Sequence, residues 1–135
     1  MSERPTLVAG LGCRRDCSLS ELLALLDSTL AEHGSSTAEL TALASSDRKV
    51  DEPGLLQLAE HLGLPISFLP ADVLTGYHER LSQTSAIALH VTGSPSVAEA
   101  SALALAERLS NRTARLWITK RKSAAATLAI ADIGR

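Results

Sequence analysis

The chain has 135 residues, of which 45% are hydrophobic and only 2% aromatic. This length fits one domain with a buried core, and the hydrophobic content excludes a disordered chain. The net charge at pH 7 is −2, and the longest apolar runs fall far short of the roughly 20 residues that a membrane-spanning helix needs. The polar N-terminus lacks the apolar stretch of a signal peptide, so we expect one cytoplasmic domain over residues 1–135 that binds neither membrane nor nucleic acid.

The first part of the chain predicts a strand, a loop and a helix. Thr6–Gly10 is a short apolar run typical of a buried strand, and a glycine-containing loop follows it. Leucines then recur at helical spacing over residues 19–30. Ser18 and Glu21 form a capping box at the start of this helix, and Gly34 supplies its end.

The next part predicts two strands around one helix. Ser36 and Glu39 form a second capping box that opens a very short helix, and the apolar run Leu40–Ala44 then predicts a buried strand that ends near residue 46. Acidic residues and Pro53 mark the start of a longer helix, which Gly63 ends. Residues 65–69 form the following predicted strand.

The last part of the chain predicts one helix and a hairpin. Residues 71–83 look helical in their first half, and Ile87–Val91 predicts an extended stretch. The helix Val97–Leu109 carries small residues on every side, so we expect it to lie buried against a sheet. The β-rich runs Ala114–Thr119 and Thr127–Ile133 predict an antiparallel hairpin, with residues 120–123 as its turn. The pattern favours a single-domain α/β fold, a three-layer α/β/α sandwich with a mixed sheet.

Three polar segments fall where strands end or helices begin, which is where ligands bind in open α/β sheets. In the first, Gly10 and Gly12 allow close approach of the backbone, and Arg14 and Arg15 can bind carboxylate or phosphate. The segment lacks the third glycine of a dinucleotide fingerprint, and a tight turn with solvated arginines is an equally good interpretation.

The second and third segments also have two interpretations each. Over residues 45–52, Lys49 can bind an acid, whereas capping of the next helix is the favoured role for Glu52. Over residues 91–99, hydroxyl and N–H groups at a helix start offer an anion site, and a serine-rich cap that includes Ser96 and Glu99 is the alternative.

The cysteines and the charge distribution add two observations. Cys13 and Cys17 have a C-x-x-x-C spacing unlike redox and zinc motifs, so we expect free thiols and no metal site. Residues 101–135 carry seven Lys or Arg against two Asp or Glu, an excess that suits an anionic ligand or a solvated face.

Four motifs, in order along the chain, resemble a family of cobalamin-biosynthesis domains. The motifs are Val8–Arg15, Ala44–Leu55, Val91–Leu103, and Lys120 with Ala126–Ala131. The resemblance spans nearly the whole chain, and the family stands alone as CobE and forms the C-terminal part of CbiG, the cobalt-precorrin-5A hydrolase. It implies a corrinoid or precorrin ligand and, among the CbiG proteins, opening of a lactone with release of acetaldehyde.

The resemblance and the charges point to the same ligand, because precorrins are polycarboxylates. The expected ligand-binding residues are Gly10, Gly12, Arg14, Arg15, Lys49, Thr92, Gly93, Ser94, Ser96, Lys120 and Lys122. We expect the three polar segments to line one pocket at one end of the sheet. Glu52 and Glu99 are the candidates for acid–base work if chemistry occurs.

Three functions stay open at this point, and a protein that binds or carries a corrinoid is favoured. A precorrin hydrolase is the second, although this chain lacks the N-terminal portion of CbiG. A nucleotide- or phosphate-binding module is the third. No cofactor is expected besides the corrinoid itself, other enzymes of the pathway are candidate partners, and the oligomeric state is open.

Overall fold

The computed structural model of the chain describes residues 6–14, 17–77 and 97–133. Its strands are β1 (Thr6–Cys13), β2 (Ala42–Ser46), β3 (Ile66–Leu69), β4 (Arg115–Lys122) and β5 (Ala126–Ile133). Its helices are α1 (Leu19–Glu32), α2 (Pro53–Leu62), α3 (Ala71–Thr75) and α5 (Val97–Ser110), with single 3-10 turns η1 (Thr37–Glu39) and η2 (Asp47–Lys49). Among the helices in these ranges, none combines the length and the hydrophobicity of a membrane-spanning segment.

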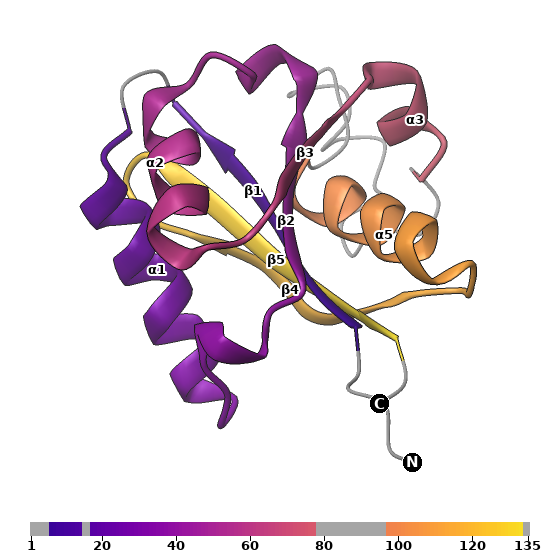
Figure 1. Cartoon of the computed structure of the whole chain (residues 1–135), viewed down its shortest axis with the longest axis horizontal. Coiled ribbons are helices and arrows are strands. Elements are labelled where there is room, and N and C mark those ends of the chain that lie inside the picture. The colour runs from indigo at the N-terminus through magenta and orange to yellow at the C-terminus, as the bar shows by residue number, and fades with distance from the viewer. Residues whose placement is uncertain (1–5, 15–16, 78–96, 134–135) are drawn as a thin grey trace.

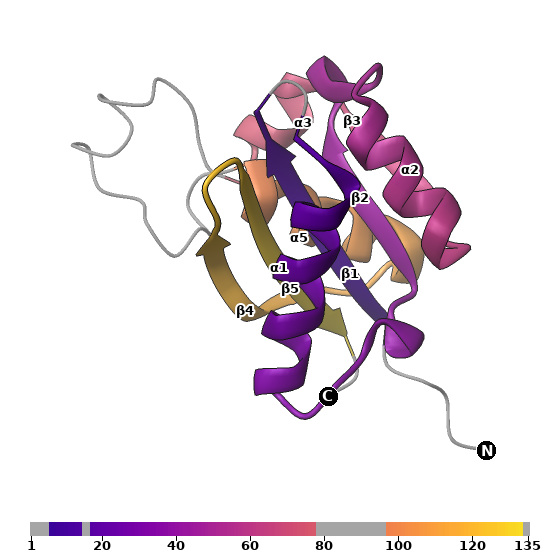
Figure 2. The ribbon, with the colours of Figure 1, turned by 90° about the vertical axis from the view of Figure 1, so that its left-hand side faces the viewer.

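The strands form one five-stranded mixed sheet between two layers of helices (Figure 1). The strand order is β3-β2-β1-β5-β4. Helices α1 and α2 pack on one face of the sheet, and α3 and α5 pack on the other (Figures 1 and 2). The predicted three-layer α/β/α arrangement with a mixed sheet is confirmed.

Strand directions decide where the loops meet. Strands β1, β2 and β3 are parallel neighbours, while β5 runs antiparallel to both β1 and β4. Strand β4 therefore runs in the same direction as β1, and four strands end at the same end of the sheet. We call this end the carboxyl edge; it is formed by Cys13, Ser46, Leu69 and Lys122, together with Ala126 at the start of β5.

Local signals place the helix ends where the sequence predicts them. The hydroxyl of Ser18 accepts the N–H of Glu21 at 3.1 Å and so caps α1. Pro53 is the first residue of α2, and Gly63 ends this helix with a left-handed φ of 67°. Helix α5 covers the predicted range and is buried at every residue from Ala98 to Ala106, as its small residues indicate.

Two predicted strand ends are wrong, because pairing carries the strands further. Strand β1 does not stop at Gly10 but continues to Cys13, which pairs with Ala126 of β5. Strand β4 likewise continues to Lys122, so the turn of the hairpin is residues 123–125. Strand β2 covers residues 42–46, so its predicted end near residue 46 is confirmed, and it begins two residues after the start of the apolar run. The extended stretch predicted for residues 87–91 lies outside the described residues.

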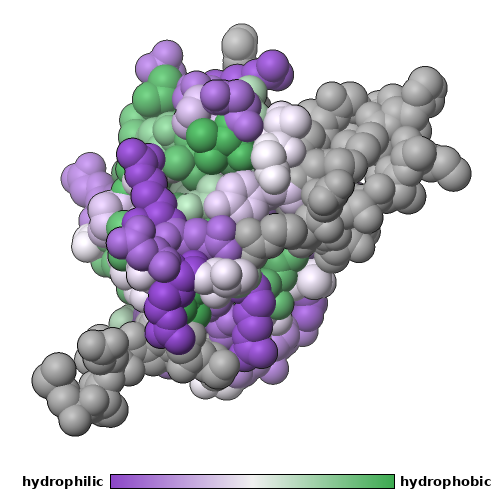
Figure 3. Space-filling view, turned by 90° about the vertical axis from the view of Figure 1, so that its right-hand side faces the viewer, coloured by the Kyte–Doolittle hydropathy of each residue, from purple (hydrophilic) through white to green (hydrophobic). Residues whose placement is uncertain are grey.

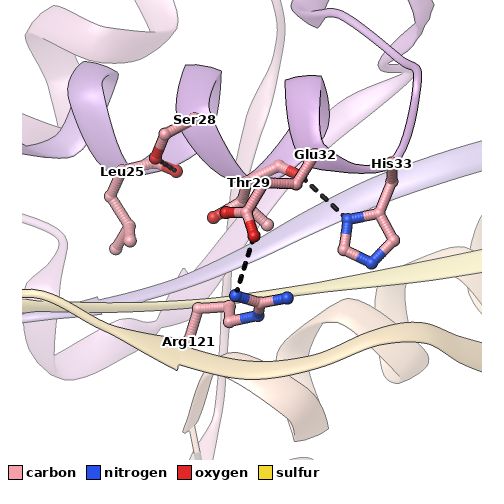
Figure 4. Close-up of polar contacts among 6 residues, drawn as sticks. All are labelled: Leu25, Ser28, Thr29, Glu32, His33 and Arg121. Atoms are coloured by element: carbon pink, nitrogen blue, oxygen red, sulfur yellow. Dashed lines mark hydrogen bonds and ion pairs between the residues drawn. The ribbon is translucent and has the colours of Figure 1, made fainter.

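Helix α1 also lies against strand β4 at its C-terminal end (Figure 4). The guanidinium of Arg121 is 3.5 Å from the carboxylate of Glu32. The His33 ring lies within hydrogen-bond distance of the Thr29 carbonyl, at 2.9 Å from Nδ1, and meets the ring of Trp117 edge-on. These contacts place the C-terminal end of α1 next to the hairpin.

Candidate functional site

The loop after β1 brings Arg14 to the carboxyl edge. The Arg14 N–H donates to the carbonyl of Ala125 at 2.8 Å, and the Arg14 carbonyl accepts the N–H of Cys17 at 3.1 Å. Its side chain is exposed. The backbone of Arg14 is therefore held on both sides while its guanidinium faces solvent. Arg15 lies outside the described residues.

The two glycines of the first segment have different surroundings. A Cβ at Gly10 would lie 1.9 Å from the carbonyl oxygen of Ala98, so α5 occupies the space that we expected for a ligand. Gly10 thus serves helix packing. A Cβ at Gly12 would lie 2.7 Å from the hydroxyl of Thr127 and 3.9 Å from the Cβ of Val97, which places Gly12 beside the start of α5 at the carboxyl edge.

The end of the hairpin adds lysines to the same edge. Lys122 pairs with Thr127 across β4 and β5, and Thr127 pairs in turn with Gly12 of β1. These three residues form one row across the sheet. Lys122 is exposed and Lys120 is half-buried. Arg121 lies between them in the sequence, but its side chain is on the other face of the sheet, where its guanidinium pairs with Glu32 of α1.

The second segment, residues 45–52, begins with a hydrogen bond to β1. The hydroxyl of Ser45 donates to the Leu11 carbonyl at 2.6 Å, and the hydroxyl of Ser46 accepts the N–H of Arg48 at 3.2 Å. Lys49 is half-buried at the end of η2. The positive charge of Lys49 lowers the pKa of the Cys13 thiol, although burial and negative charges raise it by more. Lys49 is therefore near Cys13, the last residue of β1.

Glu52 precedes α2, but its carboxylate makes no capping hydrogen bond there. The favoured sequence interpretation, a capping side chain, is wrong because this side chain is turned inward and only 7% of the residue is exposed. It lies toward Cys13 and Cys17, since the charge of Glu52 raises the pKa of both thiols. A Cβ at Gly54 would lie 2.2 Å from the Cys17 carbonyl oxygen, so α2 packs directly on this loop.

Both cysteines are free thiols. Burial first, and then the charge of Glu52, raise the pKa of Cys13 from 9.0 to about 11. Burial and the charges of Glu21 and Glu52 also raise the pKa of Cys17. Both thiols are therefore protonated near neutral pH, which does not suit a nucleophile. Among the described residues, no group of three or more His, Cys, Asp and Glu side chains is placed to hold a metal ion.

Glu99 is fully buried on the face of the sheet that α5 covers. Its carboxylate accepts the N–H of Lys120 at 2.8 Å, where the register of β4 against β5 shifts between Ile118 and Arg121. The carboxylate thus fixes an irregular stretch of the edge strand. Because Glu52 arrives with α2 on the opposite face, the two candidate carboxylates do not form a pair around one substrate atom.

The carboxyl edge thus unites part of the predicted ligand-binding set. Arg14, Gly12, Lys49 and Lys122 all lie along this edge, and the start of α5 lies beside Gly12. The sequence does not reveal the contacts of Glu21, whose carboxylate accepts hydrogen bonds from Ser123 and Ala125. No local pattern signals partners more than 100 residues away. The predicted residues Thr92, Gly93, Ser94 and Ser96 lie outside the described residues, and the shared pocket stays a prediction.

Comparison with known proteins assigns the chain to a family. Residues 7–131 match the family described as cobalamin synthesis G C-terminus. A protein named CobE from Sinorhizobium sp is 38% identical over 125 residues, which cover 93% of this chain and 79% of that protein. A cobalt-precorrin-5A hydrolase from Priestia megaterium is 30% identical over 131 residues, and the match spans only 33% of that hydrolase.

Solved structures agree with this assignment. The crystal structure of CobE, a protein from the cobalamin (vitamin B12) biosynthetic pathway, has a TM-score of 0.89 and 53% identity, covering 99% of this chain and 94% of that one. The cobalamin biosynthesis protein chiG from Agrobacterium tumefaciens str. C58 has a TM-score of 0.72 and 28% identity, covering 93% and 97%. The chain belongs to the cobalamin synthesis G C-terminal family and is a cobalamin-biosynthesis protein.

Proposed function

We propose that this protein binds a corrinoid intermediate through its peripheral carboxylates and carries it between steps of cobalamin biosynthesis. The observation that supports this most is that cations from distant segments lie along the same carboxyl edge. Arg14 follows β1, Lys49 precedes α2 and Lys122 ends β4. A polycarboxylate can satisfy several such cations at once, each through a charge-assisted hydrogen bond.

The backbone at this edge favours the same type of ligand. A Cβ at Gly12 would lie 3.9 Å from the Cβ of Val97, so this part of the carboxyl edge lies beside the start of α5, and the N-terminal end of a helix carries a partial positive charge. In the proposed complex, the rim of the large ring lies against this part of the edge. A carboxylate on that rim would then lie between the helix start and the lysines of β4.

Binding without turnover is supported better than hydrolysis. Glu52 and Glu99 lie on opposite faces of the sheet, and the Cys13 thiol is protonated at neutral pH. Neither arrangement supplies the activated nucleophile or the acid–base pair that opening of a lactone requires.

An absorbance titration tests the proposal. The probes are cobyrinic acid, a corrinoid whose side arms are free carboxylates, and cobinamide, whose arms are amides. We expect the wild-type protein to shift the spectrum of cobyrinic acid and to bind it more tightly than cobinamide. Arg14→Ala should weaken binding of the acid about tenfold, which corresponds to roughly 1.4 kcal/mol. The matched control is Arg108→Ala, because Arg108 is exposed in the last turn of α5, far from that helix's start.

Three outcomes would overturn the proposal. Equal affinity for the acid and the amide would show that the protein does not recognise the carboxylates. Loss of a precorrin lactone with release of acetaldehyde would show a hydrolase. Binding of inorganic phosphate or ATP with no affinity for either corrinoid would favour the phosphate-binding alternative.

A further inference from the structure

Glu21 lies in the first turn of α1, but its carboxylate leaves the helix. Its N–H donates to the hydroxyl of Ser18, as in a capping box. The carboxylate instead reaches the turn between β4 and β5, where one oxygen, Oε2, accepts both the hydroxyl of Ser123 and the N–H of Ala125, the latter at 2.6 Å. A single carboxylate thus connects the start of α1 to the tip of the hairpin.

The hairpin turn passes this connection on to the loop after β1. Ala125 gives its N–H to Glu21, and its carbonyl accepts the N–H of Arg14 at 2.8 Å. Glu21, Ala125 and Arg14 therefore form one chain of hydrogen bonds that starts at a negative charge. The N–H and the carbonyl of Ala125 belong to different peptide groups, so the connection is positional. The bond to the charged carboxylate is stronger than a neutral one and holds the residue whose carbonyl accepts the Arg14 N–H.

The charge of Glu21 persists at neutral pH. The hydrogen bond from Ser123 and then that from Ala125 lower the pKa of this carboxyl below its ordinary value of 4.5. A comparable carboxylate elsewhere shows what is special here. Glu39 also accepts a serine hydroxyl, that of Ser35 at 2.9 Å, but this pair is exposed, local in sequence and remote from the carboxyl edge.

We infer that Glu21 is the positioning residue of the corrinoid site, which holds the Arg14 backbone through Ala125 so that the guanidinium meets a carboxylate of the ligand. This inference rests on the proposed function. Glu21 acts through Arg14, because its Oε2 is occupied by the hairpin turn. Its contribution is to reduce the freedom of a loop that carries an exposed arginine, and so to lower the entropy lost on binding.

A double-mutant cycle with Arg14 tests this route of action. The affinity for cobyrinic acid is measured for the wild type, Glu21→Ala, Arg14→Ala and the double variant. We expect Glu21→Ala alone to weaken binding several-fold, up to about tenfold. In the Arg14→Ala background the same change should have almost no effect, since the group that it positions is gone. Glu21→Gln keeps an acceptor and the shape, so it should lose less, and the control Glu39→Gln should match the wild type.

Two results would overturn the inference. Equal losses from Glu21→Ala with and without Arg14 would show that Glu21 acts by another route, for instance through general stability. Full affinity in Glu21→Ala would show that Arg14 needs no such support.

Amide hydrogen exchange separates this inference from the proposed function. Glu21→Gln should speed exchange at the N–H groups of Arg14 and Ala125, whereas Glu39→Gln should leave both rates unchanged. If no corrinoid binds the wild type, the proposed function fails, and with it the ligand role of Glu21. Unchanged exchange in Glu21→Gln, with corrinoid binding intact, would overturn the inference alone.

Discussion

The two faces of the sheet are packed in different ways. On the α1 and α2 face the core consists mainly of leucines, including Leu22, Leu26, Leu30, Leu55 and Leu58. On the α5 face it consists mainly of alanines, including Ala98, Ala100, Ala102, Ala104 and Ala106. Leucines keep a helix at a side chain's distance from the strands, whereas alanines and a glycine bring the helix backbone onto them.

This difference has a consequence for the site. Because α5 lies so close to β1, its first residue, Val97, lies beside Gly12 at the carboxyl edge, where a Cβ on the glycine would be 3.9 Å from the Val97 Cβ. The outer surface over α3 and α5 is largely hydrophilic, with hydrophobic residues gathered toward one end (Figure 3). The α5 face, which we call the close face, thus fixes the helix start that the proposed anion site uses. The α1 and α2 face, which we call the leucine face, supplies most of the large buried side chains.

The largest expected effect comes from filling the close face. Gly10→Ala forces a Cβ to 1.9 Å from the Ala98 carbonyl oxygen, a backbone atom that moves only with α5. We expect a loss of at least about 3 kcal/mol in the free energy of unfolding, measured by urea denaturation.

Gly12→Ala is the matched control for Gly10→Ala. There the new Cβ meets the hydroxyl of the Thr127 side chain, which can rotate, so the loss should be about 1 kcal/mol or less. Equal losses in the free energy of unfolding at the two glycines would contradict the close packing of α5 on β1 at Gly10.

The second expected effect comes from emptying the leucine face. Leu26 is fully buried, so Leu26→Ala should lower the free energy of unfolding by about 2–5 kcal/mol through lost burial and a residual cavity. Leu56 on α2 is 43% exposed and serves as the control, with an expected loss below about 1 kcal/mol. Urea denaturation of both variants gives the comparison. A small loss at Leu26 would mean that the face collapses around missing side chains.

A third effect is the dependence of stability on pH that arises from the Cys13 thiol. The pKa of Cys13 is raised to about 11 in the folded protein, so the folded state holds the thiol proton more tightly than the unfolded chain. The resulting stability is fully present below about pH 9 and is lost as the pH rises through about 11. Because the thiol is only half-buried, we expect about 1 kcal/mol at most.

The measurement is the free energy of unfolding between these pH values for the wild type and Cys13→Ala. The free energy of unfolding of the wild type should fall more steeply with rising pH than that of the variant. Lysines and Cys17 titrate in both proteins, so the difference between the two curves reports Cys13. Parallel curves would contradict the raised pKa.

The smallest expected effect is that of the pair between α1 and β4. Glu32 and Arg121 are 3.5 Å apart, with side chains 57% and 41% exposed. A double-mutant cycle with Glu32→Gln and Arg121→Gln should give a coupling below about 0.5 kcal/mol, and salt should reduce it further. A coupling well above this value would show that the pair, as well as the leucines, fixes α1.

The sequence by itself determined the elements and their order. Helix ends followed from short-range chemistry, such as the Ser18 hydroxyl on the Glu21 N–H and the left-handed Gly63. The alternation of strands and helices predicted the three layers, and the family resemblance carried by four motifs is confirmed. Such features depend on neighbours within about four residues, so a linear pattern contains them.

Only the tertiary structure decided which residues share the carboxyl edge and what each one does there. Pairing with β5 extends β1 to Cys13 and β4 to Lys122, because hydrogen bonds to another strand, and not local preference, decide where a strand ends. Gly10 resembles a ligand glycine in the sequence, yet it admits α5. Glu21 resembles a cap, yet its carboxylate binds a turn 102 residues away. These roles come from contacts between distant segments, which no local pattern records.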